Sequence, residues 1–297
     1  MMMNSRTGID KKNIAVAVPC IVVILATLGA VGTGGRQRAK RIVCMMNVQR
    51  LTAAWLNYAS DNDDKLVNGE AGISYTLPHH PGENAWVGRC WGELYNQPRP
   101  PGVPWPIESQ IQSIKGGALW GHTGETRIYA CPDGEPGEML TYNIMDGANG
   151  RAVSGTYNPK VYTPKAGPDG SLLWVKKWTQ IARPASRLVF IDEGYATPDS
   201  FAVHWENQYG WWWDDPPAGH NGGTVVSFAD GHVADHKWKG RITVLFGLKY
   251  ADYKGPNLGP TSQFGLWSSA EWEDLYFVHN GCWGQTHPDF PWRPGDD

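Results

Sequence analysis

Residues 14–31 read IAVAVPCIVVILATLGAV, and no charged residue occurs from position 13 to position 35. An apolar run of this length is long enough to cross the hydrocarbon layer of a bilayer as a helix. We therefore predict a transmembrane or filament-core helix here, with a mild kink at Pro19. Two alternatives stay open: a cleaved signal peptide, whose apolar region is usually shorter, and a buried core helix.

The helical pattern continues beyond this run. Apolar residues recur every three or four positions as far as residue 58, with polar residues between them, as in an amphipathic helix. These apolar residues are Ile42, Met45, Val48, Leu51, Trp55 and Tyr58. The sequence therefore predicts one long helix, apolar all round in its first half, whose second half lays one face on a globular body.

The rest of the chain is rich in turn-forming and aromatic residues, with 36 glycines, 22 prolines and 16 tryptophans in 297 residues overall. The 41% hydrophobic and 19% charged residues exclude a highly charged disordered chain and a multi-span membrane protein. We predict an α+β fold, in which the long N-terminal helix packs on a mainly antiparallel β-sheet head with long loops. Three segments are expected: residues 1–35 with the apolar helix, 36–66 with the amphipathic helix and an acidic loop, and 67–297 as the head.

Charge is distributed unevenly, since the first 50 residues carry a net charge of +7 and the remainder −10. The apolar run inside the basic stretch argues against a nucleic-acid partner. Basic residues at 36–41 favour a cytoplasmic head by the positive-inside rule. The four cysteines outside the apolar run, an even number, favour an oxidising compartment instead. We place the head outside the cytoplasm, and this conflict stays open.

Three segments together resemble a known family. Residues 36–66 read RQRAKRIVCMMNVQRLTAAWLNYASDNDDKL, residues 129–133 read YACPD, and residues 220–233 read HNGGTVVSFADGHV, where nine residues separate His220 from Asp230 and Gly231. In this order, they resemble type IV pilin-like proteins, or pseudopilins, with a prepilin N-terminus and a C-terminal H-X9-DG motif. The resemblance implies a structural subunit and not an enzyme.

The same resemblance implies how the subunit works. An inner-membrane helix would anchor a head in the periplasm or at the cell surface, and subunits would assemble with themselves or with other pilin-like chains into a filament or pseudopilus. Counting back from Cys44 places Gly8 at the prepilin cleavage site, with Ile9 as the first mature residue. Asn13 then occupies the fifth mature position, where the family has glutamate.

Four cysteines outside the apolar run allow three sets of disulfides. Cys44 and Cys131 lie in segments that carry the resemblance, and Cys90 and Cys282 share the local pattern Cys-Trp-Gly. The resemblance therefore implies Cys44–Cys131 and Cys90–Cys282 bonds. Reduced buried thiols are the alternative.

The H-X9-DG segment predicts a β-hairpin in which Asp230 and Gly231 form a two-residue type I′ turn. A metal or catalytic cluster is the alternative. Its candidate members are His204, His220, Asp230, His232 and His236, with Asp192 and Glu193. None of these residues has the tight spacing of a known metal motif, so the hairpin is our prediction.

The acidic loop after the helix contains Asp61, Asp63 and Asp64. Carboxylates spaced in this way can chelate calcium, although the glycine and distal glutamate of an EF-hand are missing. We interpret the loop as solvated, with Ca²⁺ as the alternative, and expect no other cofactor.

The consecutive residues Trp211, Trp212 and Trp213 could pack in the core, join subunits or stack on sugars. An envelope-anchored, monomeric module that binds glycans or another surface through a tryptophan-rich face is therefore the alternative function, and a metal-dependent enzyme is the third. No hydrolase or nucleotide-binding motif occurs, so no catalytic residue is predicted.

Overall fold

The computed structural model describes residues 11–72, 80–90, 105–195, 199–206, 211–250, 258–262 and 265–296. Within these ranges, the side chains of residues 11–33, 249–250 and 261–262 are not described. The chain divides into two compact units, Met1–Lys40 and Arg41–Asp297. Residues 41–66 thus belong to the same unit as the head. The expected cleavage site at Gly8 and Ile9 lies outside the described residues.

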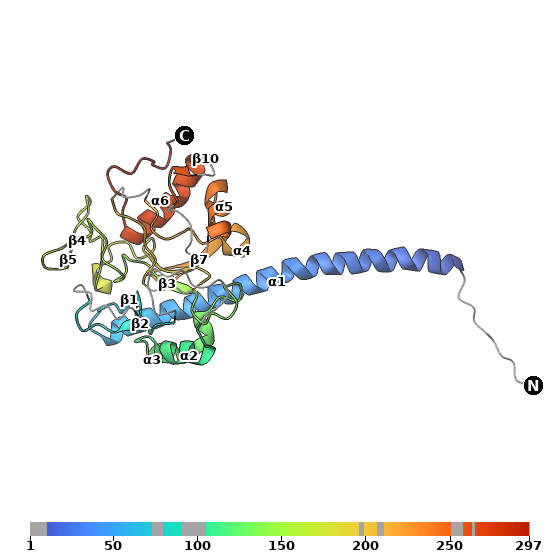
Figure 1. The fold of residues 1–297 in the computed structure, drawn as a ribbon, viewed down its shortest axis with the longest axis horizontal. Coiled ribbons are helices and arrows are strands. Elements are labelled where there is room, and N and C mark those ends of the chain that lie inside the picture. Colours follow the sequence, from blue (N-terminus) through green and yellow to red (C-terminus); the bar gives the residue numbers. More distant parts are fainter. Residues whose placement is uncertain are drawn as a thin grey trace, which may run out of the picture. The chain divides into compact units, whose positions relative to one another are not determined.

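The first element, α1 (Lys11–Asp61), is a single helix of 51 residues (Figure 1). A continuous helix that extends past residue 58 agrees with the periodicity of the sequence. In the described part of the chain, no helix has both the length and the apolar character that crossing a membrane requires. Residues 14–31, the expected membrane segment, lie in the portion of α1 whose side chains are not described.

Short helices and strands make up the rest of Arg41–Asp297. The helices are α2 (Ile107–Lys115), α3 (Trp120–Thr123), α4 (Gly219–Gly222), α5 (Arg241–Tyr250) and α6 (Ser269–Trp283), with 3₁₀ turns η1 (Thr126–Tyr129) and η2 (Trp178–Gln180). The strands are β1 (Asn68–Ala71), β2 (Ala85–Val87), β3 (Tyr142–Ile144), β4 (Tyr157–Asn158), β5 (Thr163–Pro164), β6 (Leu188–Asp192), β7 (Gly223–Phe228), β8 (Val233–Lys237), β9 (Thr261–Ser262) and β10 (Gly265–Leu266).

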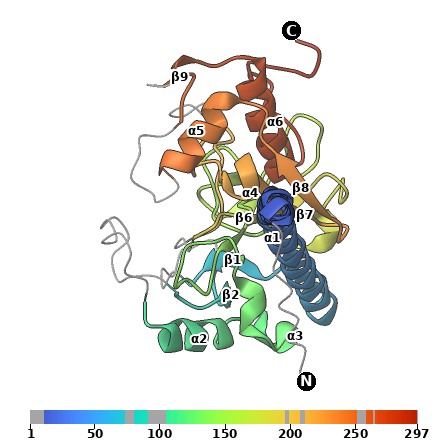
Figure 2. The same cartoon turned by 90° about the vertical axis from the view of Figure 1, so that its right-hand side faces the viewer.

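The central sheet has four antiparallel strands in the order β3-β6-β7-β8. Helices α5 and α6 lie on one side of it, and α2 and α3 lie on the other (Figures 1 and 2). The remaining strands form two-stranded pairs, of which β1–β2 is parallel and β4–β5 and β9–β10 are antiparallel. The expected α+β class with an antiparallel sheet is confirmed.

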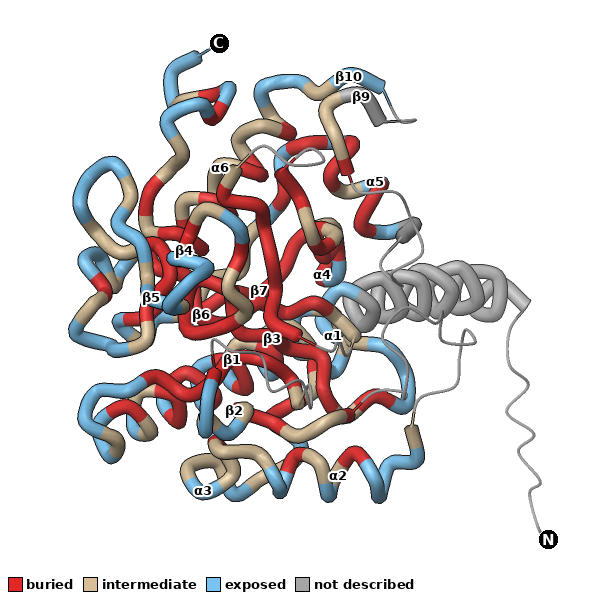
Figure 3. The backbone as a smooth tube through the Cα atoms, turned by 60° about the vertical axis from the view of Figure 1, so that its left-hand side comes forward, coloured by how far each residue is buried: buried red, intermediate tan, exposed pale blue. Residues whose placement is uncertain are grey.

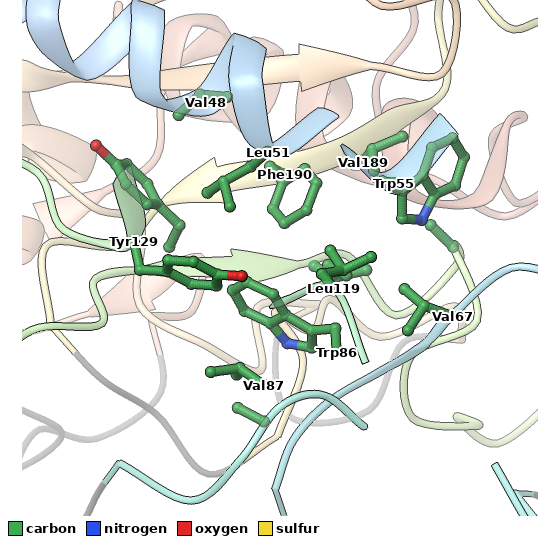
Figure 4. Close-up of a cluster of buried hydrophobic side chains, with 14 of the residues drawn as sticks. Val48, Leu51, Trp55, Val67, Trp86, Val87, Leu119, Tyr129, Val189 and Phe190 are labelled. Carbon is green, nitrogen blue, oxygen red and sulfur yellow. The ribbon is translucent and has the colours of Figure 1, made fainter. Parts of the chain in front are cut away.

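Strands β3, β6 and β7 of this sheet are buried along their whole length (Figure 3), whereas the first four residues of the edge strand β8 are half-buried. Buried hydrophobic side chains form two core clusters, one on each face of the sheet. Successive side chains of a strand point to opposite faces, so Val225 joins one core and Val226 the other. The first core packs the sheet against α1. Figure 4 shows Val48 and Leu51 of α1 together with Phe190 of β6 in this core. The second core packs the sheet against α5 and α6.

A β-bulge interrupts the alternation in β6. Leu188 pairs with Phe228 and Ile191 with Val226, so three steps along β6 match two along β7. The extra residue lets both Val189 and Phe190 enter the core against α1, while Ile191 enters the other core. Asp192, the next residue, therefore points back toward α1.

The amphipathic face of α1 is largely as predicted. Val48, Leu51 and Trp55 are fully buried, but Ile42, which the periodicity assigned to the same face, is 58% exposed. The expectation for Ile42 is wrong, because the buried face of this turn is formed by Cys44 instead.

The hairpin of the H-X9-DG segment exists, but its turn differs from the prediction. Ser227 pairs with Val233, the Phe228 N–H donates to the His232 carbonyl, and the Gly231 N–H donates to the Phe228 carbonyl. Only Gly231 of the Asp-Gly pair has a positive φ, at 97°. The connection is therefore a three-residue loop that ends on a left-handed glycine, and not a two-residue type I′ turn.

Candidate functional site

Four buried side chains converge beside the sheet. They are Cys44 on α1, Cys131 just after η1, Asp192 at the end of β6 and His220 in α4. Their sulfur, oxygen and nitrogen atoms all lie within 4.8 Å of one another. Among the described residues, this is the one group of three or more His, Cys, Asp or Glu side chains that could hold a metal ion.

Local structure explains how each side chain reaches this point. Cys44 lies one turn before Val48 on the buried face of α1. The β6 bulge turns Asp192 toward that face. Cys131 follows the last turn of η1, and its N–H donates to the Thr141 hydroxyl at 2.7 Å.

His220 reaches the group from an unusual backbone. His220 and Asn221 have φ values of 50° and 62° and Gly222 follows at 80°, so α4 is a left-handed turn and not a regular helix. Left-handed conformations are uncommon for residues other than glycine and cluster at functional sites. The His220 carbonyl accepts hydrogen bonds from Arg41 Nη2, at 3.1 Å, and from Lys237 Nζ. Side chains from α1 and β8 therefore hold this turn in place.

One ring nitrogen of His220 is the centre of the group. His220 Nε2 lies 2.9 Å from Asp192 Oδ2 and 3.3 Å from Cys131 Sγ. Cys44 Sγ in turn donates to Asp192 Oδ2 at 3.1 Å. In a cysteine–histidine–aspartate catalytic triad, the thiol and the carboxylate contact different ring nitrogens of the histidine. Here both meet the same nitrogen, so the arrangement does not fit nucleophilic catalysis.

Further hydrogen bonds surround the four side chains. The Tyr142 hydroxyl donates to Cys44 Sγ at 3.4 Å, and the Asp133 N–H donates to Cys131 Sγ at 3.3 Å. The Gly194 N–H donates to Asp192 Oδ1 at 3.1 Å. Both sulfur atoms and the carboxylate therefore have donors that stabilise negative charge.

Electrostatic coupling shifts the protonation of the group. Burial, followed by hydrogen bonding with Cys131 and the charge of Asp192, raises the pKa of the Cys44 thiol far above its usual range. Hydrogen bonds with Cys44 and then His220 lower the pKa of the Cys131 thiol, although burial opposes them. Burial alone would lower the pKa of His220, but hydrogen bonds to Asp192 and Cys131 raise it to about 10. The group thus brings together ionisable atoms whose protons a metal cation could replace.

The disulfide predictions need correction. Cys44, Cys90, Cys131 and Cys282 are all free, buried thiols. The Cys90–Cys282 pairing is wrong, because Cys90 lies in the core against α1 and Cys282 in the core on the opposite face of the sheet. Cys44 and Cys131 do meet, as the resemblance implies, but as two thiols within the four-residue group.

The cluster proposed from histidines and acids alone does not form as a unit. Of that set, only His220 and Asp192 belong to the convergent group. His232 pairs with Asp230 at 2.6 Å on the exposed hairpin turn. The others lie apart: His236 stacks on Phe277, His204 lies against Trp213, and Glu193 accepts from Asn143.

Sequence reasoning missed the group because its members are far apart along the chain. A signal was present, however. Cys44, Cys131 and His220 each lie in one of the three segments that carry the family resemblance. Asp230 and Gly231, the other half of the H-X9-DG motif, shape the hairpin turn instead.

The remaining candidate residues have local structural roles. Trp211 and Trp212 are each 1% exposed, while Trp213 is partly exposed and lies under the Arg151 guanidinium at 5.3 Å. Asp63 and Asp64 adopt positive φ values in the turn after α1. With Asp61, they are not among the side chains that converge.

Comparison with known proteins adds no relative, since no family model, curated protein or solved structure matches this chain.

Proposed function

We propose that this chain is a pilin-like structural subunit, anchored in a membrane by the first part of α1 and assembling through that helix into an envelope or extracellular filament. The proposal rests on the apolar run at residues 14–31 and on the continuity of α1 from Lys11 to Asp61. A helix that is apolar at one end and packed into a folded head at the other can anchor the head in a membrane and can also pack against the same helix of other subunits.

The observation that carries the proposal is an exposed apolar face on α1 within the head unit. Ile42, Val43 and Met46 are 58%, 45% and 56% exposed. Met46 lies four residues after Ile42 and three after Val43, so the three side chains form one patch on the side of the helix opposite the buried Val48 and Leu51. Exposed apolar patches of this kind mark protein or membrane contacts. The occupant we propose is α1 of a second copy.

The glycan-binding alternative has less support. Trp211 and Trp212 are core residues, with Trp211 against Phe290 and Trp212 against Trp238. They are not available to stack on a sugar. An enzyme is also disfavoured, because all four members of the convergent group are buried.

Only the family resemblance supports a head outside the cytoplasm. Free thiols remove the disulfide argument for an oxidising compartment, whereas the basic residues at 36–41 still favour the cytoplasm. Protease protection of the head in intact spheroplasts and in inverted vesicles separates the two orientations.

Electron microscopy of the full-length protein tests assembly. Filaments are expected from the wild-type chain, and a charge at Ile42→Glu or Met46→Glu should abolish or shorten them. Asn57→Glu, an exposed position on the same helix, is the matched control and should assemble normally. A wild-type chain that stays monomeric after detergent removal, or patch variants that assemble like the control, would contradict the proposal.

A further inference from the structure

We propose that Cys44, Cys131, Asp192 and His220 bind one zinc ion that fastens α1 to the sheet. This assignment does not depend on filament assembly. Zinc bond lengths of about 2.0–2.3 Å place the ligand atoms of a tetrahedral site about 3.3–3.8 Å apart. The observed separations of 2.9, 3.1 and 3.3 Å, with all atoms within 4.8 Å, surround a point that a single ion can occupy after small side-chain shifts.

The chemistry of the four side chains selects zinc over other common cations. Two sulfurs, one imidazole and one carboxylate suit zinc, whereas calcium and magnesium require oxygen ligands. Four protein ligands complete a tetrahedron and leave no open position for substrate. The site is therefore structural, which agrees with the burial of all four side chains.

The second nitrogen of His220 provides independent support. His220 Nδ1 is buried and has no hydrogen-bond partner among the described residues. It lies 3.8 Å from Asp133 Oδ2. When Nε2 of a histidine binds zinc, its Nδ1 carries the proton and usually donates it to a carboxylate or carbonyl. A small movement of Asp133 would complete that arrangement, so the otherwise unpaired nitrogen has a reason to face this carboxylate.

The surroundings of the sulfurs and of His220 fit the same role. Tyr142 and the Asp133 N–H donate to the two sulfur atoms, as thiolate ligands require. The left-handed backbone at His220 (φ 50°) is clamped by Arg41 from α1 and Lys237 from β8. A strained turn held from two sides keeps Nε2 directed at the other three ligands.

A bound ion would connect four segments that are distant in sequence. The ligands come from α1, the segment just after η1, the end of β6 and α4. Because a metal ion binds only the folded arrangement, it stabilises that arrangement by its binding free energy. In the H-X9-DG segment, His220 would thus be a zinc ligand, whereas Asp230 and Gly231 belong to the hairpin turn.

Metal analysis of the full-length chain, expressed and purified without chelators, tests the assignment. We expect about one zinc per chain, and at least about a tenfold lower content in Cys131→Ser and His220→Asn. Cys90→Ser replaces another buried thiol in the same core and should retain zinc. Asp133→Asn should keep the ion but weaken its affinity about 10- to 100-fold, as the loss of a histidine's supporting carboxylate does.

A second measurement avoids dependence on variants that fail to fold. Cobalt exchanged into the wild-type chain should show tetrahedral visible absorption and a thiolate charge-transfer band, and an organomercurial thiol reagent should release the zinc. Wild-type chain without zinc, or with iron in its place, would overturn the proposal. An intact mass two hydrogens below that of the reduced chain, mapped to a Cys44–Cys131 disulfide, would also overturn it.

Discussion

Replacing Leu51 by alanine should destabilise the head strongly, because this side chain is completely buried between α1 and the sheet. The substitution removes three carbon atoms, which costs about 2.4 kcal/mol at about 0.8 kcal/mol for each buried methylene. The cavity left between a helix and a sheet that are both held by other contacts adds to this cost. We expect a loss of about 3–4 kcal/mol in the free energy of unfolding, or about 6–12 °C in Tm.

Met46→Ala is the matched control, five residues earlier on the same helix. Its side chain is 56% exposed, so truncation should cost less than about 1 kcal/mol. Urea unfolding of the full-length protein in detergent, followed by tryptophan fluorescence, measures both variants. If the two differ by less than about 1 kcal/mol, α1 does not form part of the head's core in the way described.

Two further predictions concern the core on the other face of the sheet. Burial lowers the pKa of His279 from 6.5 to about 3, so the folded state keeps this imidazole neutral while the unfolded chain takes up a proton. The stability that depends on this neutral imidazole is fully present above about pH 7 and decreases as the pH falls from 6.5 toward 3. About 2 kcal/mol of the free energy of unfolding is lost at pH 5. Urea unfolding at about pH 7 and about pH 5 should show a smaller loss in His279→Gln than in the wild-type chain. The same pH dependence in both would contradict the burial of a neutral ring. Gly147→Ala should cost more than about 2 kcal/mol, because its Cβ would lie 1.8 Å from the Cys282 carbonyl oxygen. A Cβ at Gly121 would meet no atom of the described residues within 4 Å, so Gly121→Ala should be nearly neutral in thermal unfolding.

Features that depend on neighbouring residues could be predicted from the sequence. The length of α1 and the burial of Val48 and Leu51 follow from apolar spacing, and the hairpin follows from β-prone residues on both sides of Asp230 and Gly231. The details that failed depend on contacts outside each segment. Ile42 is exposed because no part of the described head covers that side of the helix turn, and the hairpin loop has three residues because the strand register places Ser227 opposite Val233.

The disulfide predictions show the same limit for residues that are far apart. The family resemblance paired Cys44 with Cys131, and these residues do meet, but as free thiols and not as the disulfide it implied. Neither composition nor the resemblance could show that Asp192 and His220 join them. Nor could they show that Cys90 and Cys282 lie on opposite faces of the sheet.

The sequence by itself determined a long helix joined to an α+β head, because helical and strand periodicity are properties of short segments. Only the tertiary structure decided where the four members of the candidate metal site meet. Their convergence needs the extra residue in β6, the left-handed turn at His220 and the packing of α1 on the sheet at the same time. Each of these depends on contacts between residues that are tens to hundreds of positions apart, and no local pattern encodes them.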